Sequence, residues 1–230
     1  MRKICTSIII ISIICGIFYG CEKEGSLVYL RPVFSKTFVR GYVDINIDNY
    51  TQYDYLAKEN VVRIRFSGTT IRTGASRFST LSEHYGDTHY NQMVASMPGW
   101  NYVLVDEFLS VDIVSDLDFG PEYPAGASLK DIAKFYGTTA YPYVKSGYDD
   151  LFMDETYTHY LSNSFVWTGK GYSYVVKLLS ELTHEDMTLL GTGAAIQFTQ
   201  APPPGNHTFT ITYTTNRGKA IIHTLEAEVE

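Results

Sequence analysis

The segment richest in metal-ligand side chains is Glu83-His84-Tyr85-Gly86-Asp87-Thr88-His89. Its imidazole nitrogens and carboxylate oxygens are ligands that zinc accepts, and three of them could close around the ion and leave one position for water. The spacing matches no known metal motif, and the polar composition is typical of a solvated loop. We therefore expect a loop here and no bound metal.

Carboxylates gather at two further places in the sequence. They are Asp112, Asp116 and Asp118 in the first and Asp149, Asp150, Asp154 and Glu155 in the second. Calcium prefers oxygen ligands of this kind, and glycoside hydrolysis uses two carboxylates at a fixed separation. Acidic residues at strand ends and turns are more often only solvated. We expect neither a cation site nor a catalytic pair, and a glycan-acting hydrolase is kept as an alternative.

Sequence patterns of common catalytic sites are missing from the chain. The nucleophile elbow, the zinc-protease helix and the P-loop do not occur, and Gly191 to Ala195 is a lone glycine cluster that indicates a turn. These observations predict a protein that is not an enzyme and holds no cofactor.

Aromatic residues are concentrated between Phe135 and Tyr174, and the whole chain has 19 Tyr but only 2 Trp. A flat ring with a polar tip suits a wet binding surface, and a sugar has the complementary character. The alternative is that these rings fill the core. The residues that we single out as a possible ligand surface are Trp100, Tyr141, Tyr143 and Trp167.

The N-terminus has the layout of a secretory signal. Arg2 and Lys3 precede an apolar stretch from Ile8 to Phe18, which is too short to span a bilayer, since a span needs about 20 apolar residues. Gly20 then stands directly before Cys21. This junction resembles the lipobox of bacterial lipoproteins, in which the cysteine becomes the lipid-bearing first residue. The resemblance implies a signal peptide over 1–20, lipid on Cys21 and a tether over 21–30; an ordinary secretory signal is the alternative.

The cysteine count and the charge restrict the chemistry further. Cys5 and Cys15 lie in the predicted signal and Cys21 would carry lipid, so the mature domain would have no free thiol and no disulfide. The formal net charge of −7 becomes −9 once Arg2 and Lys3 are removed. An acidic body is repelled by phosphate backbones, so nucleic acid is not an expected partner.

Short segments with period-two alternation dominate the rest of the chain. They are residues 42–48, 62–66, 103–105, 111–113 and 208–214. Alternation of this kind marks a half-buried strand. The last of these segments is followed by a turn at Asn216 to Gly218 and a return strand from Lys219 to Leu225, and it is preceded by a stiff connector at Pro202 to Pro204. We predict one hairpin here.

One helix is expected, from a Ser128 cap through Leu129, Ile132, Ala133 and Tyr136 to an end at Gly137. Val175 to Leu182 stays open between strand and short helix. Many short strands with few helices predict an all-β fold with one short helix, an antiparallel β-sandwich for which an immunoglobulin-like arrangement is left open. We expect one domain over 31–230, and Met97 to Gly99 is the best position for a boundary if there are two.

Two stretches of the sequence carry a family resemblance. The first is residues 110–131, with Ser110 to Asp116, Asp118-Phe119 and Pro124 to Asp131, and the second is Pro204 to Phe209. Both resemble cell-envelope lipoproteins of the Bacteroidetes. The resemblance implies an all-β domain behind a lipidated cysteine, at the outer membrane, with no established activity. Glu22 and Glu24 are similar to a surface-export signal of such proteins, so exposure on the cell surface is a hypothesis.

These observations together lead to one functional prediction. We expect a lipid-anchored, non-catalytic binding module that recognises a glycan or an envelope protein, with the membrane as its other partner through Cys21. A structural or adhesin-like subunit that associates through an edge strand is the main alternative.

Overall fold

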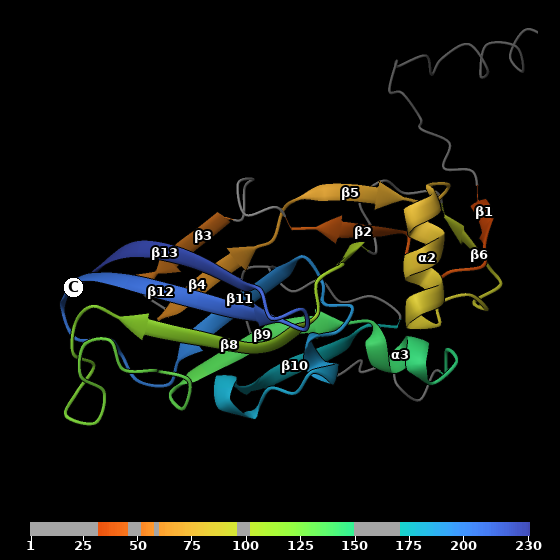
Figure 1. Cartoon of the computed structure of the whole chain (residues 1–230). Coiled ribbons are helices and arrows are strands. Elements are labelled where there is room, and N and C mark those ends of the chain that lie inside the picture. Colours follow the sequence, from red (N-terminus) through yellow and green to blue (C-terminus); the bar gives the residue numbers. More distant parts are fainter. Residues whose placement is uncertain (1–31, 46–51, 58–59, 96–101, 150–170) are drawn as a thin grey trace, which may run out of the picture.

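The computed structural model describes residues 32–45, 52–57, 60–95, 102–149 and 171–230 (Figure 1). The predicted signal, Cys21, the tether, Trp100, Trp167, the boundary at Met97 to Gly99 and part of the second carboxylate group lie outside these residues. In the described part, no helix is long and apolar enough to cross a bilayer.

The fold is all-β and sandwich-like, as the sequence predicts. The larger sheet has five antiparallel strands in the order β10-β9-β11-β4-β3. Its strands are β3 (Gln52–Leu56), β4 (Val61–Arg65), β9 (Ala133–Thr139), β10 (Ser173–Leu178) and β11 (Gly193–Phe198).

The opposing sheet has three antiparallel strands in the order β13-β12-β8. They are β8 (Phe108–Ser115), β12 (Gly205–Thr215) and β13 (Ala220–Val229). The predicted C-terminal hairpin is therefore confirmed, and Gly218, at φ 73°, takes the left-handed conformation that its turn requires. Pro202 to Pro204 precede β12 and belong to no strand.

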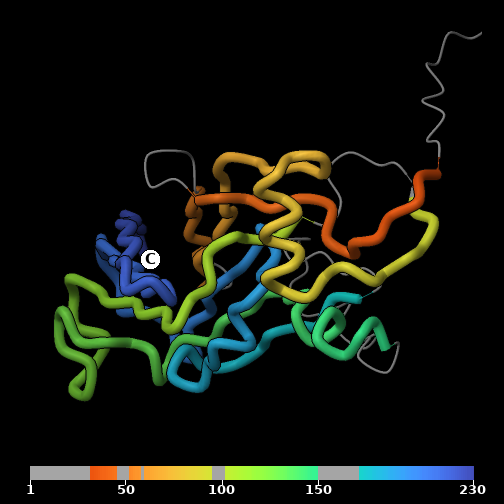
Figure 2. Tube along the Cα trace, turned by 45° about the vertical axis from the view of Figure 1, so that its right-hand side comes forward, coloured from red at the N-terminus to blue at the C-terminus, as the bar shows by residue number. Residues whose placement is uncertain are grey.

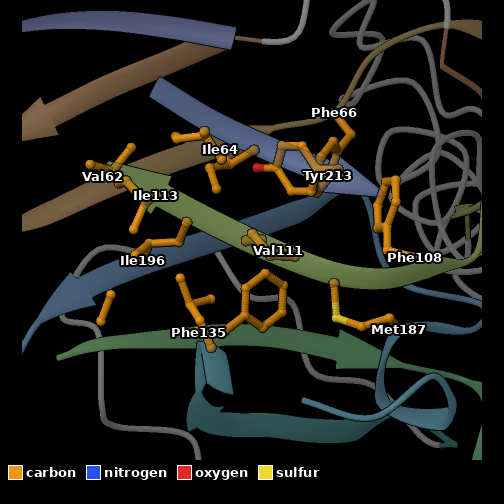
Figure 3. Close-up of a cluster of buried hydrophobic side chains, with 14 of the residues drawn as sticks. Val62, Ile64, Phe66, Phe108, Val111, Ile113, Phe135, Met187, Ile196 and Tyr213 are labelled. Atoms are coloured by element: carbon orange, nitrogen blue, oxygen red, sulfur yellow. The ribbon is translucent and has the colours of Figure 1, made fainter. Parts of the chain in front are cut away.

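The core lies between these two sheets (Figure 3). Val111 and Ile113 of β8 face Val62 of β4, Phe135 of β9 and Ile196 of β11, and each of these side chains is 2% exposed or less. In β12, Phe209, Ile211 and Tyr213 are fully buried, and the threonines between them are not. Period-two alternation thus orients both sheets as the sequence predicts.

A third sheet and a two-stranded ribbon lie at the end where the described chain begins (Figures 1 and 2). The third sheet, β5-β2-β7, contains the parallel pair β2–β7, and the ribbon pairs β1 with β6. The strands are β1 (Pro32–Ser35), β2 (Gly41–Asp44), β5 (Thr69–Arg72), β6 (Gln92–Ala95) and β7 (Tyr102–Leu104).

The helices are also found at this end. They are α2 (Ser76–Tyr85) and α3 (Tyr141–Lys145), with two single 3-10 turns, η3 (Leu179–Glu181) and η4 (Glu185–Met187), elsewhere. Phe78, Ser82 and Tyr85 of α2 pack towards the third sheet in a second buried cluster that contains Tyr42, Val103 and Tyr143. The C-terminus lies at the opposite end of the molecule (Figure 1).

The helix predicted from Ser128 to Gly137 is wrong. Ala133–Thr139 is strand β9, which is bonded on one side to β10 and on the other to β11. The hydroxyl of Ser128 donates to Oδ1 of Asp112 at 2.5 Å, so it anchors a turn against β8. Pairing on both edges outweighs the weak helical pattern, because local propensity is only a small energy per residue.

Three smaller differences concern boundaries. Glu83 to Tyr85 are the last turn of α2 and not part of a loop, since Gly86 at φ 75° ends the helix. Gly193 begins β11, although the sequence predicts a turn from Gly191 to Ala195. Val175 to Leu182, which the sequence left open between strand and short helix, contains the end of strand β10 followed by the 3-10 turn η3.

Candidate functional site

Five aromatic rings meet beside the first buried residues of the described chain. Phe38 is the centre, with ring centroids 5.0 Å from Tyr143, 5.4 Å from Tyr90 and 5.6 Å from Tyr172. Tyr148 completes the group, 5.2 Å from Tyr90 and 5.6 Å from Tyr143. We call these five residues the aromatic cluster. Its edge-to-face pairs contribute about 0.5–1.5 kcal/mol each beyond burial, so the cluster is a stiff unit.

The carboxylate of Asp87 is hydrogen-bonded to this cluster. Its side chain is fully buried, and its carboxylate accepts the backbone N–H of Phe38 at 2.7 Å and of Val39 at 2.8 Å. The Tyr148 hydroxyl donates to Oδ1 at 2.8 Å. Burial raises the pKa of Asp87, and the three donors oppose that rise. Gly86 turns the chain so that Asp87 points inward, where its N–H bonds to the Ser82 carbonyl at 2.8 Å.

Tyr148 has a backbone conformation that is rare for a bulky residue. It follows α3 at φ 70°, directly after Gly147 at φ 75°. Its N–H bonds to the Tyr143 carbonyl at 2.9 Å, and its hydroxyl bonds to Asp87. A non-glycine residue held at positive φ stores about 1–3 kcal/mol of strain, and such residues are concentrated at binding sites.

Only part of the cluster reaches the surface. Phe38, Tyr143 and Tyr172 are buried, whereas Tyr90 and Tyr148 are half-buried. We call Tyr90 and Tyr148 the tyrosine pair. It is a small aromatic surface in which the Tyr148 hydroxyl is bonded to the buried Asp87 carboxylate.

The predicted ligand-surface residues are therefore only partly placed at the surface. Tyr143 is a correction, because its ring is fully buried and belongs to the core, as the core-packing alternative predicts. Tyr141 is half-buried, with Nζ of Lys145 5.5 Å from its ring centroid. Trp100 and Trp167 lie outside the described residues. Tyr90 was missed since it precedes the aromatic-rich stretch by 45 residues, and only the fold brings it to Tyr148.

A second polar site is formed by Glu107, next to the start of β8. Its carboxylate accepts from Nε2 of His84 at 3.2 Å, Nε2 of His184 at 2.7 Å and Nδ2 of Asn216 at 2.9 Å. Burial alone would raise the pKa of Glu107, but the two histidine hydrogen bonds lower it overall. The glutamate therefore connects α2, the segment before η4 and the β12–β13 turn.

In the fold, the side chains of the candidate metal segment, Glu83 to His89, have different partners. His84 faces Glu107, Asp87 points into the aromatic cluster, and His89 bonds to the Thr88 hydroxyl at 2.7 Å. Throughout the described part of the chain, no three His, Cys, Asp or Glu side chains are placed to hold a metal ion.

The first carboxylate group has local structural roles. Asp116 Oδ1 accepts the Thr208 N–H at 2.6 Å, and Asp118 Oδ1 accepts the Ala125 N–H at 2.7 Å. The hydrogen bonds from Thr208 lower the pKa of Asp116. In the second group only Asp149 is described; Asp150, Asp154 and Glu155 lie outside the described residues.

Asp106 is a half-buried carboxylate that lies outside both carboxylate groups of the sequence analysis. Burial raises its pKa, and the nearby Asp44 carboxylate adds to the rise. Asp44 is held by Arg77 at 2.5 Å. An acid of raised pKa beside a second carboxylate is what general acid catalysis uses, and such a pair also occurs in structural ion networks.

A Ser–His pair also occurs, which the sequence analysis did not identify. Nδ1 of His207 lies 2.8 Å from the Ser115 hydroxyl, and Nε2 lies 2.7 Å from the Pro203 carbonyl. A carbonyl only accepts, so Nε2 carries the proton and Nδ1 accepts from Ser115. Both side chains are at most 2% exposed. The pair therefore fastens the proline connector to β8 and does not serve as a nucleophile and base.

No known protein family, curated protein or solved structure matches this chain. The immunoglobulin-like arrangement and the resemblance to envelope lipoproteins therefore stay predictions, and the function has to be argued from the sites themselves.

Proposed function

We propose that this protein is a lipid-anchored cell-envelope protein whose β-sandwich presents a non-catalytic binding site for a glycan at the tyrosine pair. The observation that carries the proposal is Tyr148. Its strained backbone and its bond to buried Asp87 fix a half-exposed ring next to Tyr90.

The tyrosine pair has the properties that sugar recognition needs. A pyranose has an apolar C–H face and hydroxyl edges, and a tyrosine ring offers an apolar face with a hydroxyl at its tip. Binding is stronger when the site is already ordered, since no rotamer freedom is lost on association. Asp87 and the buried rings of Phe38 and Tyr143 supply that order.

A thermal-shift screen of the full chain against polysaccharide fragments tests the binding site. A glycan at 100 times its dissociation constant stabilises the folded state by about 2.7 kcal/mol. For a domain of this size that corresponds to a rise of about 5–11 °C in Tm. We expect Tyr90→Ala and Tyr148→Leu to abolish the shift.

Tyr123→Ala is the matched control. Tyr123 is also half-buried, but it lies in the β8–β9 connection at the other end of the molecule. Its substitution should leave the glycan shift unchanged. If no glycan shifts Tm, or if Tyr123→Ala abolishes the shift as Tyr90→Ala does, the tyrosine pair is not the site. Copurification of a partner protein would then become the relevant measurement.

The anchor is tested separately in cells. Cys21→Ser should move the protein from the membrane fraction to the soluble fraction, because the lipid would have no attachment atom. Cys5→Ser and Cys15→Ser are controls that alter the predicted signal without touching the acceptor cysteine. Retention of Cys21→Ser at the membrane would refute lipid anchoring. Protease added to intact cells tests surface exposure, and a chain cleaved only after lysis lies inside.

The second candidate function is that of a structural subunit. Among the described strands β13 is hydrogen-bonded only to β12. It also contacts β3 through His223, which stacks on Tyr53, and Ile222 on β13 is 59% exposed. An open edge can accept a strand from another chain. Self-association in analytical ultracentrifugation that Ile222→Lys removes would support this role, and a monomer at all concentrations would contradict it.

A further inference from the structure

The β1–β6 ribbon carries an unusual share of the exposed apolar side chains. Six large hydrophobic residues are exposed among the described residues, and three of them lie on this ribbon: Val33 at 49%, Phe34 at 59% and Met93 at 65%. Phe34 is paired with Met93 across the two strands, so their side chains are neighbours on one face. An exposed apolar group of this kind marks a contact with a partner or a membrane.

The position of the ribbon limits what that partner can be. β1 begins at Pro32, and ten residues, 22–31, separate it from Cys21. Even when fully extended, a segment of that length spans at most about 40 Å, so β1 begins no farther than that from Cys21. β1 is thus the first described element after the proposed anchor, and it lies at the extreme end of the molecule in both views (Figures 1 and 2).

The charges are distributed along the same axis. Lys36 and Arg72 are exposed and Arg40 is half-exposed, and all three flank the ribbon or the adjoining third sheet. Exposed acidic residues collect at the opposite end, around the β8–β9 connection and the C-terminal half of β13. They are Asp116, Asp118, Glu122, Glu226, Glu228 and Glu230. A bilayer with anionic head groups attracts the first end and repels the second.

We infer that the ribbon is a second membrane contact: Phe34 and Met93, which share one face, enter the head-group region of the bilayer that holds the lipid on Cys21. This inference rests on the proposed anchor and goes beyond it. A lipid chain on a tether fixes distance but not orientation, whereas an apolar ribbon beside basic side chains also fixes which end faces the bilayer. The acidic end then points away from the membrane.

The test uses the full chain, isolated with its lipid and reconstituted into phosphatidylethanolamine–phosphatidylglycerol vesicles that contain a nitroxide-labelled lipid. Gln92→Cys and Glu228→Cys each introduce a thiol at an exposed position, one on the ribbon and one at the acidic end, and a fluorophore is attached there. We expect the lipid nitroxide to quench the fluorophore at 92 at least twofold and to leave the fluorophore at 228 unquenched. Phe34→Ser with Met93→Ser should abolish the quenching at 92 while the protein still floats with the vesicles.

The outcomes distinguish a failure of the proposed orientation from a failure of the proposed lipid anchor. Flotation with equal quenching at both positions overturns the inference and leaves the anchor intact. Quenching at 92 that survives Phe34→Ser with Met93→Ser also overturns it, because the ribbon side chains would then not be the contact. A chain that does not float overturns the anchor and the inference with it.

Discussion

Asp87→Asn is the substitution that most directly tests how the aromatic cluster is held. The two backbone donors, from Phe38 and Val39, bond to different oxygens of the carboxylate, Oδ1 and Oδ2. An amide has one oxygen and one NH₂ group, and the NH₂ group cannot accept. One of the two backbone N–H groups must therefore face another donor in the variant.

The expected loss follows from these two facing donors. A buried polar group without a partner costs about 1–3 kcal/mol, and the variant leaves two of them. We expect Asp87→Asn to lower the free energy of unfolding by about 3 kcal/mol, which lowers Tm by about 6–12 °C for a domain of this size. Tyr148→Phe removes one donor to Asp87 and the long hydrogen bond that the hydroxyl accepts from the His89 N–H, and both Asp87 oxygens keep their backbone donors, so its loss should be about 1 kcal/mol.

Urea unfolding at pH 7, followed by far-UV circular dichroism, measures these differences. Asp118→Asn is the control, because Asp118 is exposed and accepts one backbone N–H that an amide oxygen can also accept. Its change should stay within about 0.5 kcal/mol. If Asp87→Asn is no less stable than Asp118→Asn, the hydrogen bonds of Asp87 do not hold the cluster and the argument for an ordered tyrosine pair is lost.

The same carboxylate predicts a pH dependence. Burial raises the pKa of Asp87 in the folded state above its ordinary value, so the folded chain keeps this proton where the unfolded chain has lost it. The resulting stability is fully present below the unfolded pKa and is lost as pH rises through the folded pKa. Asp87→Asn should lack this part of the pH profile, and an unchanged profile would show that another group is responsible.

Three further predictions concern other parts of the fold. The pKa of Glu107 is lowered in the folded state, so its contribution to the free energy of unfolding is present above the unfolded pKa and is lost as pH falls through the folded pKa. Glu107→Gln should therefore flatten the decline of the urea midpoint below about pH 4.5. In Gly68→Ala the new Cβ would lie 2.0 Å from a backbone carbonyl oxygen, so we expect the free energy of unfolding to fall by about 3 kcal/mol or more. Gly74→Ala is the comparison: its Cβ would meet open space, but its φ of 97° is strained for alanine, so we expect a loss of about 1–2 kcal/mol. His207→Leu should cost about 2–4 kcal/mol in the same urea assay, because it removes the imidazole that is hydrogen-bonded to the buried Ser115 hydroxyl and to the Pro203 carbonyl. A stability equal to wild type would contradict the structural role of this pair.

Two differences between sequence and structure have a common physical origin. Leu129, Ile132, Ala133 and Tyr136 form a helical stripe in the sequence, yet Ala133–Thr139 is a central strand because β10 and β11 bond to both of its edges. The ten residues of α2 were missed, although Phe78, Ser82 and Tyr85 have helical spacing and Gly86 supplies the stop signal. For segments this short, the period of the apolar residues is ambiguous, and pairing with distant strands decides the outcome.

The sequence by itself determined the class of fold and the faces of its strands. Alternation in 62–66, 111–113 and 208–214 records which side chains are buried, because successive side chains point to opposite faces of a sheet. In 42–45 the alternation does not distinguish the faces, since Tyr42 and Val43 are both buried. The tertiary structure alone decided the sites: it brought Asp87 to Phe38 across 49 residues of chain and Tyr148 to Asp87 across 61. Such contacts have no local signature, since a hydrogen bond between distant residues is selected by the packing of whole sheets and leaves no periodic pattern in either segment.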